Sequence, residues 1–130
     1  VMTNEEKGME LVLYWKEKRT YVEEMPYKKA YERWRCNMKE EDYERISNLI
    51  NAIADDTVQI DTILLRPNEW VGSLYEPVYL ACNKNRKGTA MFFEMIIFKV
   101  LLEREDKWQF SLDLNHSSLI DRLIYTKKIT

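Results

Sequence analysis

The fold of this chain depends on one stretch, TAMFFEMIIFKVLL, which covers residues 89–102. Apolar side chains occur on every face of this stretch, so periodicity does not separate a helix buried on all sides from a strand covered on both faces. Aromatic and β-branched residues dominate it, which favours a strand. Only Glu94 and Lys99 interrupt the apolar run, and it is too short and too charged to cross a bilayer. We therefore predict a strand over 89–102.

The residues on either side of this stretch support a sheet. In WQFSLDL, residues 108–114, apolar and polar side chains alternate with the period of a half-buried strand. The short link 103–106 suits a hairpin, and residues 58–65 and 74–82 are two further strand candidates. Pro77 places the last of these at an edge or a bulge. Residues 83–88, NKNRKG, form a turn cluster.

The first 56 residues carry helical patterns instead. Thr3 and Glu6 have capping-box spacing, which predicts a helix running toward Arg19. A second helix begins at Pro26, and a third covers residues 37–56 with an apolar stripe. Ser117 or Ser118 begins a short C-terminal helix. The prediction is one α+β domain over 1–130, with about three N-terminal helices on an antiparallel sheet of about four strands.

Composition limits the function classes. The 130 residues include 20 Lys+Arg and 22 Asp+Glu, for a net charge of −2, so neither a strongly basic nucleic-acid module nor an acidic DNA mimic is favoured. Cys36 and Cys82 lack CxxC spacing, which indicates free thiols in a reducing, cytoplasmic location. His116 is the only histidine, so we expect no His-rich metal site and no cofactor.

No catalytic constellation is visible, and we expect the chain not to be an enzyme. His116 is either a general base beside Asn115 and Ser117 or an ordinary residue between two elements. Cys36 lies near Arg33 and Arg35 in sequence, which would favour a thiolate, but free cysteines are commonly small buried hydrophobes. Glu94, a carboxylate among apolar residues, is the first candidate for a pocket residue. The alternative for Glu94 is a position on an exposed face, or an ion pair with a basic residue on the neighbouring strand.

Two sets of residues suggest binding. Tyrosine and tryptophan are enriched in interface cores, and the chain has eight and four of them. The candidate interaction residues are Tyr27, Tyr31, Trp34, Trp70 and Tyr75. Basic residues on the second helix and in the 83–88 turn are candidates for contact with an anion or a nucleic acid. These are Lys28, Arg35, Lys84, Arg86 and Lys87.

Three hypotheses follow from these patterns. The leading one is a small cytoplasmic protein-interaction domain that occludes a partner, such as an inhibitor, an immunity-type protein, an adaptor or an anti-defence protein. Its expected partner is another protein or a second copy of this chain, and no membrane is expected to take part. The second hypothesis is nucleic-acid binding through the basic helix and the basic turn. The third is a small-ligand pocket protein that uses Glu94.

Overall fold

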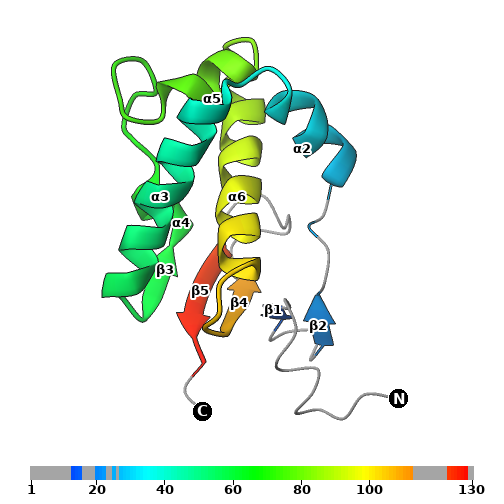
Figure 1. The fold of residues 1–130 in the computed structure, drawn as a ribbon, viewed down its shortest axis with the longest axis vertical. Helices are drawn as coiled ribbons and strands as arrows, with labels where there is room; N and C mark the ends of the chain where they lie inside the picture. The colour runs from blue at the N-terminus through cyan, green and yellow to red at the C-terminus, as the bar shows by residue number, and fades with distance from the viewer. Residues whose placement is uncertain (1–12, 16–19, 23–24, 26, 113–122, 129–130) are drawn as a thin grey trace.

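The computed structural model describes residues 13–15, 20–22, 25, 27–112 and 123–128 of the chain (Figure 1). Its fold is α+β, as expected. The described elements are β1 (Leu13–Trp15), β2 (Thr20–Val22), α2 (Lys28–Arg35), α3 (Glu40–Asp56), β3 (Gln59–Asp61), α4 (Thr62–Leu65), α5 (Glu76–Ala81), α6 (Arg86–Leu102), β4 (Trp108–Leu112) and β5 (Leu123–Lys127).

Helix α6 is the central element, and the strand predicted over 89–102 is wrong. Figure 1 shows α6 upright in the middle of the molecule, with α3 and α2 on either side, α5 across its upper end and β4 and β5 near its lower end. Ten of its 17 residues are buried. A helix surrounded by other elements on all sides needs apolar residues on all faces, which removes the amphipathic signal by which sequence analysis recognises a helix.

The sheet is mixed and has five strands in the order β2-β1-β4-β5-β3. The pairs β1–β2, β4–β5 and β3–β5 are antiparallel, whereas β1 and β4 are parallel. Strand β4 confirms the alternating pattern predicted from residue 108 onward, because Trp108 and Phe110 are each 1% exposed. Phe110 lies opposite Tyr125 of β5 and also packs on Phe98 of α6, with ring centroids 5.5 Å apart, so the sheet contacts the central helix.

The two terminal helices of the prediction are not confirmed. Residues 13–15 and 20–22 are strands, and residues 123 and 124 belong to β5. The remaining residues of those predicted helices, 3–12, 16–19 and 117–122, lie outside the described residues. The described parts of these segments are strands because they pair with strands that are distant in sequence: β1 pairs with β4, and β5 lies between β4 and β3. Local helical spacing carries no information on such partners.

Two predicted strands also change. Residues 58–65 contain the short strand β3, but helix α4 follows at once, and the Asp61 side chain accepts a hydrogen bond from the Ile63 amide at 3.2 Å to cap it. Residues 76–81, predicted as part of a strand, form α5. Pro77 lies in the first turn of α5, where a missing N–H group has no helical acceptor to lose.

The second and third helices are confirmed as α2 and α3. Helix α3 buries Ile46, Ile50 and Ala54 on one face and ends at Asp56, near the predicted stop. The turn predicted over 83–88 is confirmed only for 83–85, because residues 86–88 begin α6. Asn83 and Lys84 have φ of 54° and 62°, and the Asn85 side chain accepts from the Gly88 amide at 2.8 Å. The described buried hydrophobic residues form one core around α6.

Candidate functional site

Four of the five candidate interaction rings pack against the phenylalanines of α6. Tyr31 and Trp34 of α2 each lie 5.8 Å from the Phe92 ring, measured between centroids. The corresponding distances from Phe93 are 5.5 Å for Trp70 and 4.7 Å for Tyr75. Tyr31 and Trp70 are both 6% exposed, so these two rings belong to the core rather than to a free surface. Of the five, Tyr27 is the ring that lies mostly in solvent, at 54% exposed.

The two predicted basic segments, far apart in sequence, lie side by side. The Asn37 side chain, just after α2, donates to the Ala81 carbonyl oxygen at the end of α5 at 3.0 Å. A Cβ atom placed on Gly88 would lie 3.4 Å from the Trp34 ring, so α2 also touches the start of α6. Helix α2 and the turn before α6 therefore share the upper end of the molecule (Figure 1).

The basic residues in these segments differ in what they contact. The Arg35 guanidinium forms an ion pair with Glu40 and lies 3.8 Å above the centroid of the Tyr43 ring. Arg86 forms an ion pair with Glu69 at 2.9 Å. The remaining candidates are exposed and form no ion pair within the described part of the chain; they are Lys28, Lys84 and Lys87.

A set of exposed aliphatic residues was missed by the sequence analysis. Val71, Leu74 and Leu80 are 57%, 63% and 52% exposed, and we call these three residues the α5 surface. A strand over 74–82 would place Leu80 on the same face as the buried Val78. In the observed helix, Leu80 is exposed on the side opposite the buried Val78. The signal that could have revealed this is Pro77, which is as common in the first turn of a helix as at a strand edge.

Glu94 is buried inside the molecule rather than exposed on a pocket wall. Its side chain is 1% exposed, and its Oε1 accepts a hydrogen bond from Arg66 Nη2 at 2.9 Å. Arg66 follows α4, so this ion pair connects α6 to α4. Glu94 lines neither the cavity between α3 and the 103–106 loop nor the hollow along the outer face of α3.

The surroundings of Glu94 favour its neutral form. Burial raises the pKa of Glu94 to about 7, and Thr62 and Arg66 offset part of this increase. Burial also raises the pKa of Tyr125, which is 0% exposed, and the negative charge of Glu94 adds to the effect. Glu94 Oε2 and the Tyr125 hydroxyl have no hydrogen-bond partner among the described atoms. A carboxyl group of this kind can exchange a proton near neutral pH.

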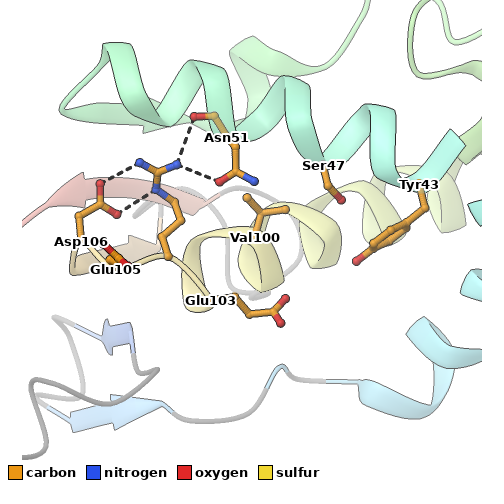
Figure 2. Close-up of a pocket in the computed structure, with 8 residues that line it drawn as sticks. Tyr43, Ser47, Asn51, Val100, Glu103, Glu105 and Asp106 are labelled. Carbon is orange, nitrogen blue, oxygen red and sulfur yellow. Dashed lines mark hydrogen bonds and ion pairs between the residues drawn. The ribbon is translucent and has the colours of Figure 1, made fainter. Parts of the chain in front are cut away.

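A cavity of about 560 Å³ lies between α3 and the segment that joins α6 to β4. In Figure 2, Asn51 and Asp106 stand at one end of it and Tyr43 at the other, with Ser47 and Val100 between them. The remaining lining residues are Glu103, Arg104 and Glu105. Ser47 Oγ is buried there without a hydrogen-bond partner among the described atoms.

Arg104 contacts several side chains at one end of this cavity, and these contacts occupy the guanidinium nitrogens that a ligand could use. Its Nε and Nη2 donate to the two carboxylate oxygens of Asp106, each at 2.9 Å. Its Nη1 donates to the side chain of Asn51 at 2.8 Å, and Nη2 also reaches Asp55 at 2.6 Å. Hydrogen bonding to Arg104 lowers the pKa of Asp106 to about 2. The guanidinium therefore joins α3 to the loop before β4, and an anionic ligand would have to displace these contacts.

The remaining candidates for chemistry are the two cysteines and His116. Cys82 is 3% exposed, and burial raises the pKa of its thiol to about 12, whereas Cys36 is exposed. His116 lies outside the described residues. Across the described ranges, no three His, Cys, Asp or Glu side chains are grouped so that they could hold a metal ion. Within the same ranges, no helix is long and apolar enough to span a membrane.

Comparison of the chain with models of protein families, with curated proteins and with solved structures found no match.

Proposed function

We propose that this chain is a cytoplasmic protein-binding domain that acts without catalysing a reaction, by covering the surface of a partner protein. The observation that carries this proposal is the α5 surface. Three large aliphatic side chains, each more than half exposed, lie within ten residues of sequence, in α5 and in the segment just before it. Single exposed apolar residues are ordinary, but exposed apolar residues that lie together are typical of protein interaction sites. An inhibitor, an adaptor, an immunity-type protein or an anti-defence protein would each work in this way.

The test is affinity capture with matched variants. Wild-type protein, Leu80→Glu and Leu64→Glu are immobilised and exposed to a lysate of the source cells, and the retained proteins are identified and quantified. Leu64 of α4 is 79% exposed, so Leu64→Glu makes the same chemical change on another exposed helix. We expect a defined partner to be retained by the wild type and by Leu64→Glu, and to be reduced at least tenfold by Leu80→Glu. Light scattering of the wild type identifies the case in which the partner is a second copy.

Retention is compared only among variants that have the wild-type circular dichroism spectrum and melt within a few degrees of the wild type. Equal retention by both variants would show that the α5 surface is not the binding site. Absence of any defined partner, together with a monomeric state in solution, would overturn the proposal.

A second candidate is nucleic-acid binding, and the contact between α2 and the turn before α6 is the observation that favours it. That contact places the C-terminal end of α2, with Arg35, beside the segment that carries Lys84 and Lys87, in a chain whose net charge is −2. The test is a titration of single- and double-stranded oligonucleotides at low and at moderate salt. Phosphate contacts predict an affinity that decreases as salt increases. Binding that is absent, or that does not respond to salt, would exclude this candidate.

A further inference from the structure

The α5 surface continues directly into a basic segment, which we call the basic turn; it consists of Lys84 in the turn and of Arg86 and Lys87 in the first turn of α6. The Asn83 amide donates to the Leu80 carbonyl oxygen at 3.1 Å, and the Lys84 amide donates to the Tyr79 carbonyl oxygen at 2.9 Å. These two bonds fold the chain back over the end of α5. The charge of Lys84 and the apolar side chain of Leu80 are therefore neighbours at the same end of one short helix.

The acidic residues near this turn are already engaged. Glu69 forms its ion pair with Arg86 at 2.9 Å, and Glu76 accepts a hydrogen bond from the Gly72 amide at 2.7 Å. Lys84 and Lys87 are exposed and form no ion pair within the described ranges. Their charges are free to meet carboxylates from outside the molecule.

The start of α6 adds to this positive potential. Arg86 and Lys87 stand in its first turn, which contains no acidic residue. A helix N-terminus already carries partial positive charge, so cations there are unfavourable for the isolated helix. The first turn of α2, with Lys28 and Lys29, also lacks an acidic residue. Because α2 meets α5 and α6 at its C-terminal end, through Asn37 and Trp34, the uncompensated charges that an acidic partner would neutralise here are those of Lys84 and Lys87.

The side chains beside these charges suit a protein better than a nucleic acid. Single-stranded nucleic acids are held by aromatic side chains on which bases stack. Here the neighbouring rings face inward: Trp34 packs on Phe92, and Tyr79 is 9% exposed. The exposed neighbour is Leu80, and Leu74 is exposed just before the same helix; both contribute apolar area without a stacking surface.

We propose that the α5 surface and the basic turn together bind an acidic, amphipathic segment of a partner protein. Its carboxylates contact Lys84 and Lys87, and its apolar side chains pack on Leu74 and Leu80. This inference rests on the proposed function and adds the chemical class of the partner. Charge complementarity of this kind selects partners and orients them before the apolar contacts form.

The test uses defined fluorescent peptides and measures their binding by anisotropy. The first is a helical peptide of about 18 residues, five turns, with leucines on one face and glutamates on the other. In the second, every glutamate is replaced by lysine, and in the third, every leucine is replaced by serine. Oligodeoxythymidine of similar length is the fourth probe. Each is titrated with the wild type, Leu80→Ser, and the double variant Lys84→Glu with Lys87→Glu.

We expect the wild type to bind the acidic amphipathic peptide at least tenfold more tightly than the other three probes. Leu80→Ser and the double charge reversal should each weaken that binding at least tenfold. The double variant should in addition gain affinity for the lysine peptide, a reversal that a merely unfolded variant would not show. Leu64→Ser and Arg45→Glu, which change exposed residues on α4 and α3, are the matched controls and should bind as the wild type does.

Equal binding of the acidic peptide by all variants, or none by the wild type, would overturn the inference. Tighter binding of oligodeoxythymidine would overturn it in favour of the nucleic-acid candidate. A lysate partner that depends on Leu80, combined with no binding of the acidic peptide, would leave the proposed function standing and reject only this description of the partner.

Discussion

Glu94 is an ionisable side chain in the middle of an apolar helix, and its partner comes from another element. Desolvation of a carboxylate is costly, and the ion pair with Arg66 at 2.9 Å offsets part of that cost. Burial nevertheless dominates, because the pKa of Glu94 is raised to about 7 from an ordinary value of 4.5. The folded state therefore binds a proton more tightly at Glu94 than the unfolded state does, so the pH dependence of stability has a definite sign.

Glu94 should make the protein less stable as pH rises. Its contribution to the free energy of unfolding is complete below about pH 4.5 and is lost as pH rises through 7. Glu94→Gln does not titrate, so the stability of the variant relative to the wild type should increase by about 3 kcal/mol between pH 4.5 and pH 8. Urea denaturation across this range measures the difference. Tyr125→Phe keeps the titrating group and should keep the wild-type slope, and parallel profiles for the wild type and Glu94→Gln would contradict the prediction.

The two cysteines should differ sharply in reactivity. The thiolate is the reactive form, and burial raises the pKa of Cys82 to about 12, whereas Cys36 is exposed. Ellman's reagent at pH 8 should modify about one thiol per native chain and the second only after unfolding. In Cys36→Ala, the native protein should be almost unreactive. Rapid labelling of Cys82 in that native variant would show that the region around α5 opens readily.

At the scale of elements, Arg104 joins α3 to the loop that enters β4. Its guanidinium is 13% exposed and contacts Asn51, Asp55 and Asp106 together. Trp108 also contributes to this connection, because its Nε1 donates to Asp106 at 2.9 Å. This network spans segments about 50 residues apart in sequence. It has no signature in the local pattern, since charged residues near helix ends are common on any solvated surface.

Removal of the Arg104 side chain should destabilise the protein far more than removal of a surface ion pair. We expect Arg104→Ala to lower the free energy of unfolding by about 2–4 kcal/mol, because the partly buried Asp106 loses its two hydrogen bonds from Arg104 and keeps only Trp108 and Lys127 as partners. Arg45→Ala, which removes a 52% exposed side chain 3.4 Å from Asp42, should cost less than about 0.5 kcal/mol. Urea denaturation compares the two variants. Equal effects would show that the Arg104 network contributes no more than an ordinary surface contact.

Elements differed in how well their sequences predicted them. Helices α2 and α3 have one apolar face and one polar face, and both were recognised. Helix α6 has no polar face, and the short helix α5 contains Pro77 and β-forming residues, so both were predicted as strands. The candidate site followed the same division: the position of Lys84 in a turn was predicted, but Lys87 lies in the first turn of α6, and the exposure of Leu80 depended on the state of α5.

For the whole molecule, α6 is the element on which the others depend. It contacts α2, α3 and α5, and its Phe98 reaches the sheet through Phe110. The described buried hydrophobic residues belong to one cluster, so no layer of the described structure has a separate core. Loss of packing in α6 should therefore affect both the helical end and the sheet.

Unfolding should proceed in one transition. Circular dichroism and tryptophan fluorescence should give the same midpoint, because Trp34 and Trp70 report on the helical end and Trp108 on the sheet. Phe92→Ala, at 0% exposed, should lower the free energy of unfolding by about 3–5 kcal/mol and move both signals together. Separate midpoints for the two signals would show that the sheet and the helical end unfold independently.

The sequence by itself determined the α+β class, helices α2 and α3, strand β4 and the turn before α6, because each of these has a local signal: an amphipathic stripe, an alternation of period two, or a turn cluster. Only the tertiary structure decided that residues 89–102 are a helix, that Arg66 pairs with Glu94, and that α2 lies beside the turn at Lys84. Each of these depends on which distant segments surround a residue. Burial on all sides gives the same apolar sequence whether the backbone is a helix or a strand, so only the surrounding elements distinguish the two.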